Sequence, residues 1–101
     1  MFKDAVTGAL VYGGAMALVG LATGDGLNLA GNAVNGAIMG AAILADDATH
    51  SMTSMDPSVA SSAVVTGGWF AVMESFLRGD SRILRNVLAG ATTSIVVDTY
   101  Y

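Results

Sequence analysis

The chain has 101 residues, room for one domain, and only 12% are charged, against roughly 25% in a typical soluble domain. Apolar residues make up 53%, the mean hydropathy is +0.62, and cysteine is absent. This composition excludes disorder, disulfide scaffolds, thiolate metal sites and thiol catalysis. Four basic residues and a net charge of −4 argue against nucleic-acid binding, so the composition favours a small membrane protein.

Four uncharged runs predict four helices, and they cover residues 5–24, 26–45, 57–73 and 86–97. The first two have twenty residues each, which matches the roughly 20 needed to cross a hydrocarbon core. The third is long enough if Glu74 lies near the interface, and the fourth spans only if Arg85 reaches outward. Because the apolar residues neither alternate nor leave a polar face, we predict an all-α fold of membrane-embedded helices. The alternative is a subunit that its neighbours bury in a larger assembly.

The first two breaks between helices are marked by turn-forming and polar residues. Residues 23–26 contain two glycines that can take positive φ after the first helix. Residues 46–56, which are rich in Ser, Thr and Asp, predict a polar loop. Asp56 then has the character of an N-cap, and Pro57 suits the first position of the third helix.

The third break predicts the end of one helix and the cap of the next. We expect Gly79 to end the third helix and Asp80 or Ser81 to cap the fourth. The chain then consists of two tandem helical hairpins, residues 1–50 and residues 51–101, within one membrane domain.

The two predicted hairpins resemble each other when the chain is shifted by 54 residues. Residues 9–18 then align with 63–72, and residues 32–37 align with 86–91, with eight identities in the two blocks. A shared Gly-Gly pair and an aligned Asn favour an internal duplication. Chance similarity in a sequence rich in Ala and Gly is the alternative.

Small residues predict where the helices pack against each other. In residues 5–45, twenty of forty-one are Ala or Gly, which allow close approach where lipid gives no hydrophobic reason to associate. Asn28, Asn32 and Asn35 form a polar stripe that we interpret as inter-helix hydrogen bonding, with a water or ion path as the alternative. The predicted helix-packing residues are Gly20, Gly24, Asn28, Asn32, Asn35, Gly36, Gly40, Gly67, Gly68, Asn86 and Gly90.

Charged residues gather near the predicted end of the third helix, and we expect them at the membrane interface. His50 follows Asp46 and Asp47 by four and three residues, but so few ligands on a polar loop are usually solvated. We therefore predict no metal site, cofactor or catalytic residue, and we do not expect an enzyme. Glu74 and Arg78 lie four residues apart, in the order that favours a helical salt bridge. The predicted interfacial charges are Glu74, Arg78, Arg82 and Arg85.

An even number of spans would place both termini and the 46–56 loop on one side of the membrane. That side has one basic residue, Lys3, whereas the other side has three arginines. The positive-inside rule then places the arginines inside and both termini outside.

The Gly/Ala-rich hairpins at 5–45 and 59–100 resemble, in organisation, the small membrane or coat proteins of lipid-containing viruses. These include the hairpin coats of lemon-shaped archaeal viruses, from which this chain departs by having two hairpins. The resemblance implies a structural role in a virion or host-cell membrane, with many copies packed side by side. The implied partners are the lipid bilayer, further copies of the chain, and a capsid or other membrane protein. A holin-like pore former or small channel is the alternative function.

Overall fold

The computed structural model describes residues 2–24, 29–56 and 58–101. These residues form an all-α fold, as predicted, and the helices within them are α1 (Phe2–Ala22), α2 (Leu29–Thr53), α3 (Val59–Arg78) and α4 (Ile83–Tyr100). Helix α1 packs mainly on α2, and α3 packs mainly on α4. The chain therefore has the predicted order of two helical hairpins.

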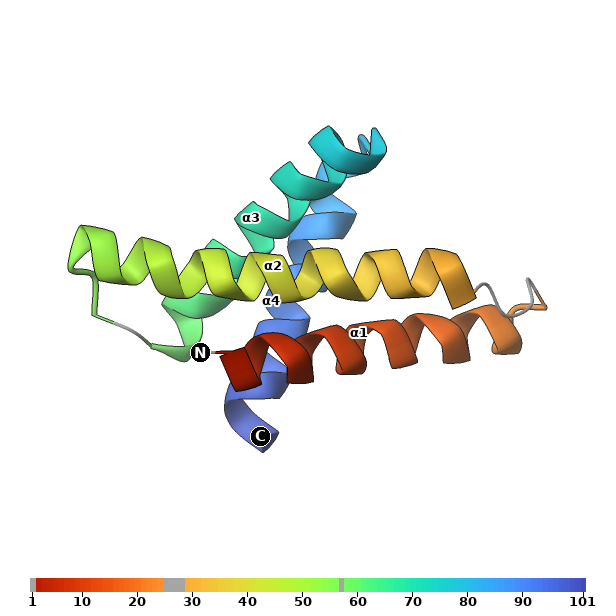
Figure 1. Cartoon of the computed structure of the whole chain (residues 1–101), viewed down its shortest axis with the longest axis horizontal. Coiled ribbons are helices and arrows are strands. Elements are labelled where there is room, and N and C mark those ends of the chain that lie inside the picture. The colour runs from red at the N-terminus through yellow and green to blue at the C-terminus, as the bar shows by residue number, and fades with distance from the viewer. Residues whose placement is uncertain (1, 25–28, 57) are drawn as a thin grey trace.

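The two hairpins cross each other. Figure 1 shows α3 and α4 running together across the longer α1–α2 hairpin. The molecule measures 44 × 29 × 20 Å. In the same view, the start of α1, the α2–α3 connection and the end of α4 lie toward the lower left. The end of α1 and the α3–α4 turn lie toward the right and top, so the helix ends fall into two groups on opposite sides.

An apolar cluster at the crossing joins the hairpins. Phe70 of α3 is fully buried, and its ring contacts Tyr12 of α1 edge-on, with ring centroids 5.2 Å apart. Side chains of α2 complete this cluster, and they are Ile38, Met39 and Ala42. Edge-to-face aromatic pairs add to the dispersion contacts of a packed core, so Phe70 links α3 to the first hairpin.

Glycines allow the two helices of each hairpin to touch at their backbones. A Cβ atom on Gly36 would lie 2.7 Å from the carbonyl oxygen of Ala9. A Cβ atom on Gly67 would lie 2.5 Å from the carbonyl oxygen of Val87, and one on Gly90 would lie 2.7 Å from the Gly67 Cα. No side chain fits at these separations unless a backbone shifts.

The remaining predicted glycines differ in their surroundings. Gly40 also faces backbone, since its Cβ would lie 3.0 Å from the Ala5 carbonyl oxygen. Within the described part of the chain, Gly24 and Gly68 have no neighbouring atom within 4 Å of such a Cβ, and Gly20 is partly exposed. Within one copy, therefore, only some of the predicted small residues lie at close helix contacts.

The predicted polar loop at 46–56 is wrong for most of its length, because α2 continues to Thr53. The hydroxyl groups of Thr49 and Thr53 each donate to the carbonyl four residues earlier. Asp46 pairs with His50 across the same turn spacing. The polar side chains that predict a loop thus find partners along the helix, and the division of the chain after residue 50 falls inside the last turn of α2.

The predicted N-cap of α3 is also wrong. Ser58, not Asp56, is the N-cap. The Ser58 hydroxyl accepts from the Ser61 N–H at 3.1 Å, and the Ser61 hydroxyl accepts from the Ser58 N–H at 3.0 Å. This reciprocal pair is a capping box, which satisfies two N–H groups at the helix start. Pro57 lies outside the described residues.

The glycines predicted to end helices do so. Gly24 follows α1 with φ 81°, and Gly79 follows α3 with φ 65°, both in the left-handed region that favours glycine. The other predicted turn residues, 25 and 26, lie outside the described part. The N-cap of α4 is Arg82, without a side-chain cap bond, so the prediction of Asp80 or Ser81 there is wrong.

Among the described helices, the stretch Lys3–Ala22 in α1 has the length and composition needed to cross a membrane. A core helix of a soluble protein and an N-terminal signal sequence satisfy the same criterion. Within the described residues, α1 is the one helix that meets this criterion, and the four spans stay a prediction.

Candidate functional site

A polar pocket of about 500 Å³ lies beside the α3–α4 turn. Helix α1 contributes Tyr12 and Met16 to its wall, and α2 contributes Asn35. The end of α3, the turn and the start of α4 supply the rest, including Glu74, Arg78, Asp80, Arg82, Arg85 and Asn86. The crossing of the hairpins thus brings together one residue of the predicted Asn stripe and all four predicted interfacial charges.

Asp80 holds the turn together by accepting hydrogen bonds from Arg82. The Arg82 guanidinium donates to both carboxylate oxygens, each at 3.0 Å, and its backbone N–H donates to one of them at 3.0 Å. Arg85 lies 3.6 Å from the second oxygen. The hydrogen bonds from Arg82 are the main reason that the pKa of Asp80 lies well below its ordinary value.

This lowered pKa predicts an acid sensitivity. The ionised Asp80 carboxylate stabilises the fold above the ordinary aspartate pKa, and its contribution disappears as the pH falls below about 4. In the unmodified protein, we expect the denaturation midpoint to fall as the pH is lowered from about 5 to about 2, and in Asp80→Asn we expect it to fall less. Circular dichroism of the protein in detergent measures the midpoint. The exposed Asp56→Asn variant is the control, and equal acid sensitivity of Asp80→Asn and the unmodified protein would contradict the role of Asp80.

Glu74 lies in the wall of the pocket with only 3% of its side chain exposed. Its Oε2 is 3.9 Å from the Arg78 Nε, at the long end of the range for an ion pair. Arg78 also donates to Asn35 Oδ1 on α2. Among the described residues, the Glu74 Oε1 has no hydrogen-bond partner. The predicted salt bridge is thus loose, and one buried carboxylate oxygen is left without a hydrogen-bond donor among the described residues.

The asparagines predicted to pack helices, those of the stripe and Asn86, lie in different surroundings. Asn86 is buried in the pocket wall, and among the described residues its side-chain nitrogen has no hydrogen-bond partner. Asn32 lines a separate apolar groove between α1 and α2, away from Asn35. Asn28 lies outside the described residues. Asn32 and Asn35 therefore do not line a common pocket in this chain.

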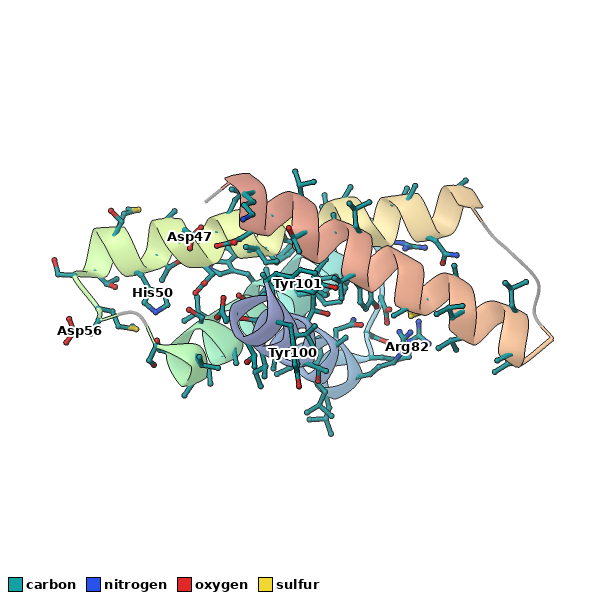
Figure 2. The ribbon with its side chains drawn as sticks, turned by 90° about the horizontal axis from the view of Figure 1, so that it is seen from below. Asp47, His50, Asp56, Arg82, Tyr100 and Tyr101 are labelled. Carbon is teal, nitrogen blue, oxygen red and sulfur yellow. The ribbon has the colours of Figure 1, made fainter. Side chains whose placement is uncertain are left out.

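A second polar group lies toward the opposite end, where Figure 2 shows Asp47, His50 and Asp56 far from Arg82. The His50 Nδ1 is 2.9 Å from the Asp46 carboxylate and 3.0 Å from its carbonyl oxygen. Both are acceptors, so we assign the proton to Nδ1, and Nε2 then accepts from the Ser61 hydroxyl at 2.9 Å.

The expectation that His50 and Asp46 are solvated is wrong, because α3 covers them and both are buried. Asp46, His50 and Ser61 lie in sequence, so the Ser61 hydroxyl could transfer a proton to the His50 imidazole. Since Ser61 also forms the capping box of α3, the array ties the end of α2 to the start of α3. No sequence signal identifies Ser61, which lies eleven residues from His50 in the next helix. In the described residues, no group of three His, Asp or Glu side chains is arranged to hold a metal ion.

This link predicts a loss of stability when His50 is removed. His50→Ala removes the close contact with the buried Asp46 carboxylate and the acceptor of the Ser61 hydroxyl, so we expect about 1–3 kcal/mol less free energy of unfolding. Ser51→Ala, at an exposed position on the same helix, should have little effect. Chemical denaturation in detergent measures both, and equal effects would show that the His50 contacts do not stabilise the fold.

No protein-family model matches this chain, and comparisons with curated proteins and with solved structures also give no match. The polarity of the surface and the geometry of the two polar groups are therefore the features that bear on function.

Proposed function

We propose that this chain is a small integral membrane protein with a structural role, packed in many copies to shape or line a membrane such as that of a virion. The observation that carries the proposal is the exposure of large apolar side chains on every helix, together with polar and ionisable groups among the buried residues. Soluble monomers rarely expose large continuous apolar patches. In a bilayer, apolar side chains face lipid, and the polar ones face the interior of the protein.

Large apolar side chains are exposed on every helix, for example Leu10 (72%), Val34, Phe76 (85%) and Leu88. Beside the apolar cluster around Phe70, the interior also holds polar and ionisable groups. The buried ones are Asp46, His50, Thr66, Glu74, Asn86, Thr93 and Ser94. Lipid, or apolar helices of neighbouring copies, would cover the exposed apolar side chains. The buried polar groups would stay within the protein.

The crossing hairpins fit a bilayer if they tilt in opposite directions from its normal. Spanning helices tilt by about 20° on average and by up to about 40°. In Figure 1, the start of α1, the α2–α3 connection and the end of α4 would then lie at one surface, and the α3–α4 turn at the other. This is the grouping that the predicted topology requires, and it would place the arginines of the turn near headgroups.

Further copies could pack at small residues that one chain leaves uncovered. Gly14, Gly24 and Gly68 have open space beside them. An apolar groove of about 320 Å³ also runs between α1 and α2, and Ala and Gly form most of its wall. In lipid, such surfaces let helices from neighbouring chains approach closely, which supports dense packing of copies.

Reconstitution into liposomes tests the proposal. The chain should stay with the membrane after an alkaline carbonate wash, and chemical cross-linking should give oligomers. Gly68→Leu should weaken these oligomers, whereas Ser51→Leu, outside the small-residue faces, should not. Release by carbonate would overturn the membrane role. Rapid leakage of entrapped dye would overturn the structural role in favour of the pore-forming alternative.

A further inference from the structure

The pocket beside the α3–α4 turn has more positive than negative charge. Three guanidinium groups, those of Arg78, Arg82 and Arg85, face the carboxylates of Glu74 and Asp80. Arg82 already donates hydrogen bonds to both carboxylate oxygens of Asp80. Each guanidinium has five N–H donors, so Arg78 and Arg85, whose side chains are 34% and 43% exposed, retain donors for an anion. The pocket therefore favours a ligand with one negative group.

The same pocket also contains a buried hydrogen-bond acceptor that has no donor in the described part of the chain. The Glu74 side chain is more than nine-tenths buried, and its Oε1 has no partner among the described residues. A buried acceptor without a donor costs free energy that a ligand N–H could recover. A simple anion would leave this oxygen unpaired and would add a negative charge near it. The ligand should therefore have an ammonium group with N–H donors as well as the anionic group.

We propose that this pocket binds a phosphoethanolamine group, with the phosphate at Arg78 and Arg85 and the ammonium group at Glu74. The pocket volume of about 500 Å³ lies within the usual range of roughly 300–1,000 Å³ for small-ligand sites. A choline headgroup does not fit this chemistry, because its trimethylammonium has no N–H to donate. As a lipid headgroup, the ligand rests on the proposed membrane function, since the arginine-bearing turn would then lie at the membrane surface.

Titration of the purified full-length protein in detergent tests the chemistry without a bilayer. The probes are glycerophosphoethanolamine, glycerophosphocholine and glycerol 3-phosphate, and the readout is isothermal calorimetry. We expect glycerophosphoethanolamine to bind at least about tenfold more tightly than either of the others, because only it satisfies Glu74 and the arginines together. Equal affinity for glycerophosphocholine, or no binding of glycerophosphoethanolamine, would overturn the proposal.

Two variants separate the contacts. Glu74→Gln should remove the preference for ethanolamine over choline but keep the phosphate interaction. Arg85→Gln should weaken binding of all three probes. Asp98→Asn lies on α4 away from this pocket, so it should change neither the preference for ethanolamine nor the affinity for the probes. Circular dichroism checks that each variant is folded. If Glu74→Gln kept the full preference for ethanolamine, the assignment of the ammonium group to Glu74 would be wrong.

Nanodiscs distinguish a lipid headgroup from a free ligand. Native mass spectrometry of the protein released from mixed phosphatidylethanolamine and phosphatidylcholine discs should show retained phosphatidylethanolamine, and Glu74→Gln should lose it. Binding of the soluble probe without lipid retention would support the pocket chemistry and assign it to a free ligand. Because the titration needs no bilayer, its failure is distinguishable from failure of the carbonate test of membrane integration.

Discussion

Replacing Phe70 with alanine is expected to lower the free energy of unfolding by about 3 kcal/mol or more, which is typical of a large buried aromatic residue. Its ring is fully buried at the crossing of the hairpins and contacts Tyr12. The cavity left behind would be bordered by α1, α2 and α3, so the connection between hairpins should weaken before either hairpin does. Chemical denaturation in detergent micelles, followed by circular dichroism, measures the change.

Phe76→Ala is the matched control on the same helix. Its ring is 85% exposed, so within one copy its removal should change the free energy of unfolding by no more than about 0.5 kcal/mol. A similar loss for both variants would mean that Phe70 does not hold the hairpins together in the way that the crossing implies.

Gly67→Ala is expected to destabilise the α3–α4 hairpin by about 1–3 kcal/mol, because the added methyl meets backbone that cannot turn away. Its Cβ would lie 2.5 Å from the Val87 carbonyl oxygen and 3.3 Å from the Ala91 nitrogen. The backbones would have to separate, and the Gly90 contact with Gly67 would loosen as well. Thermal and denaturant unfolding of the variant measure the loss.

The neighbouring glycine gives an internal comparison. Gly68 has no atom within 4 Å of an added Cβ, so Gly68→Ala should be neutral or should stabilise by about 0.5–1 kcal/mol through its better helix propensity. The two substitutions add the same methyl to adjacent positions on one helix. If Gly68→Ala were the more harmful, the arrangement of α3 against α4 would be wrong.

The number of helices could be predicted because the breaks are local. Gly24 and Gly79 have positive φ where the sequence places helix ends, and that conformation is a property of the residue itself. The extension of α2 past Asp46 could not be predicted in the same way. Its polar side chains have the composition of a loop, and their partners in the helix appear only after α3 packs over His50.

The candidate pocket depends on contacts that no sequence spacing reveals. The charge cluster from Glu74 to Arg85 is visible as a local concentration of charge. Tyr12 and Asn35 join it only because the second hairpin crosses the first near them. The burial of Glu74 likewise follows from that crossing, whereas the i, i+4 spacing alone predicts an interfacial salt bridge with Arg78.

Trp69 offers the most direct measurement of whether the apolar surface faces lipid. It is the only tryptophan, it is 39% exposed on α3, and its indole N–H donates to the Thr49 hydroxyl at 2.9 Å. In liposomes made with lipids brominated along the acyl chain, we expect strong quenching of its fluorescence and little quenching by aqueous acrylamide. Efficient quenching by acrylamide without quenching by the brominated lipid would contradict the membrane account.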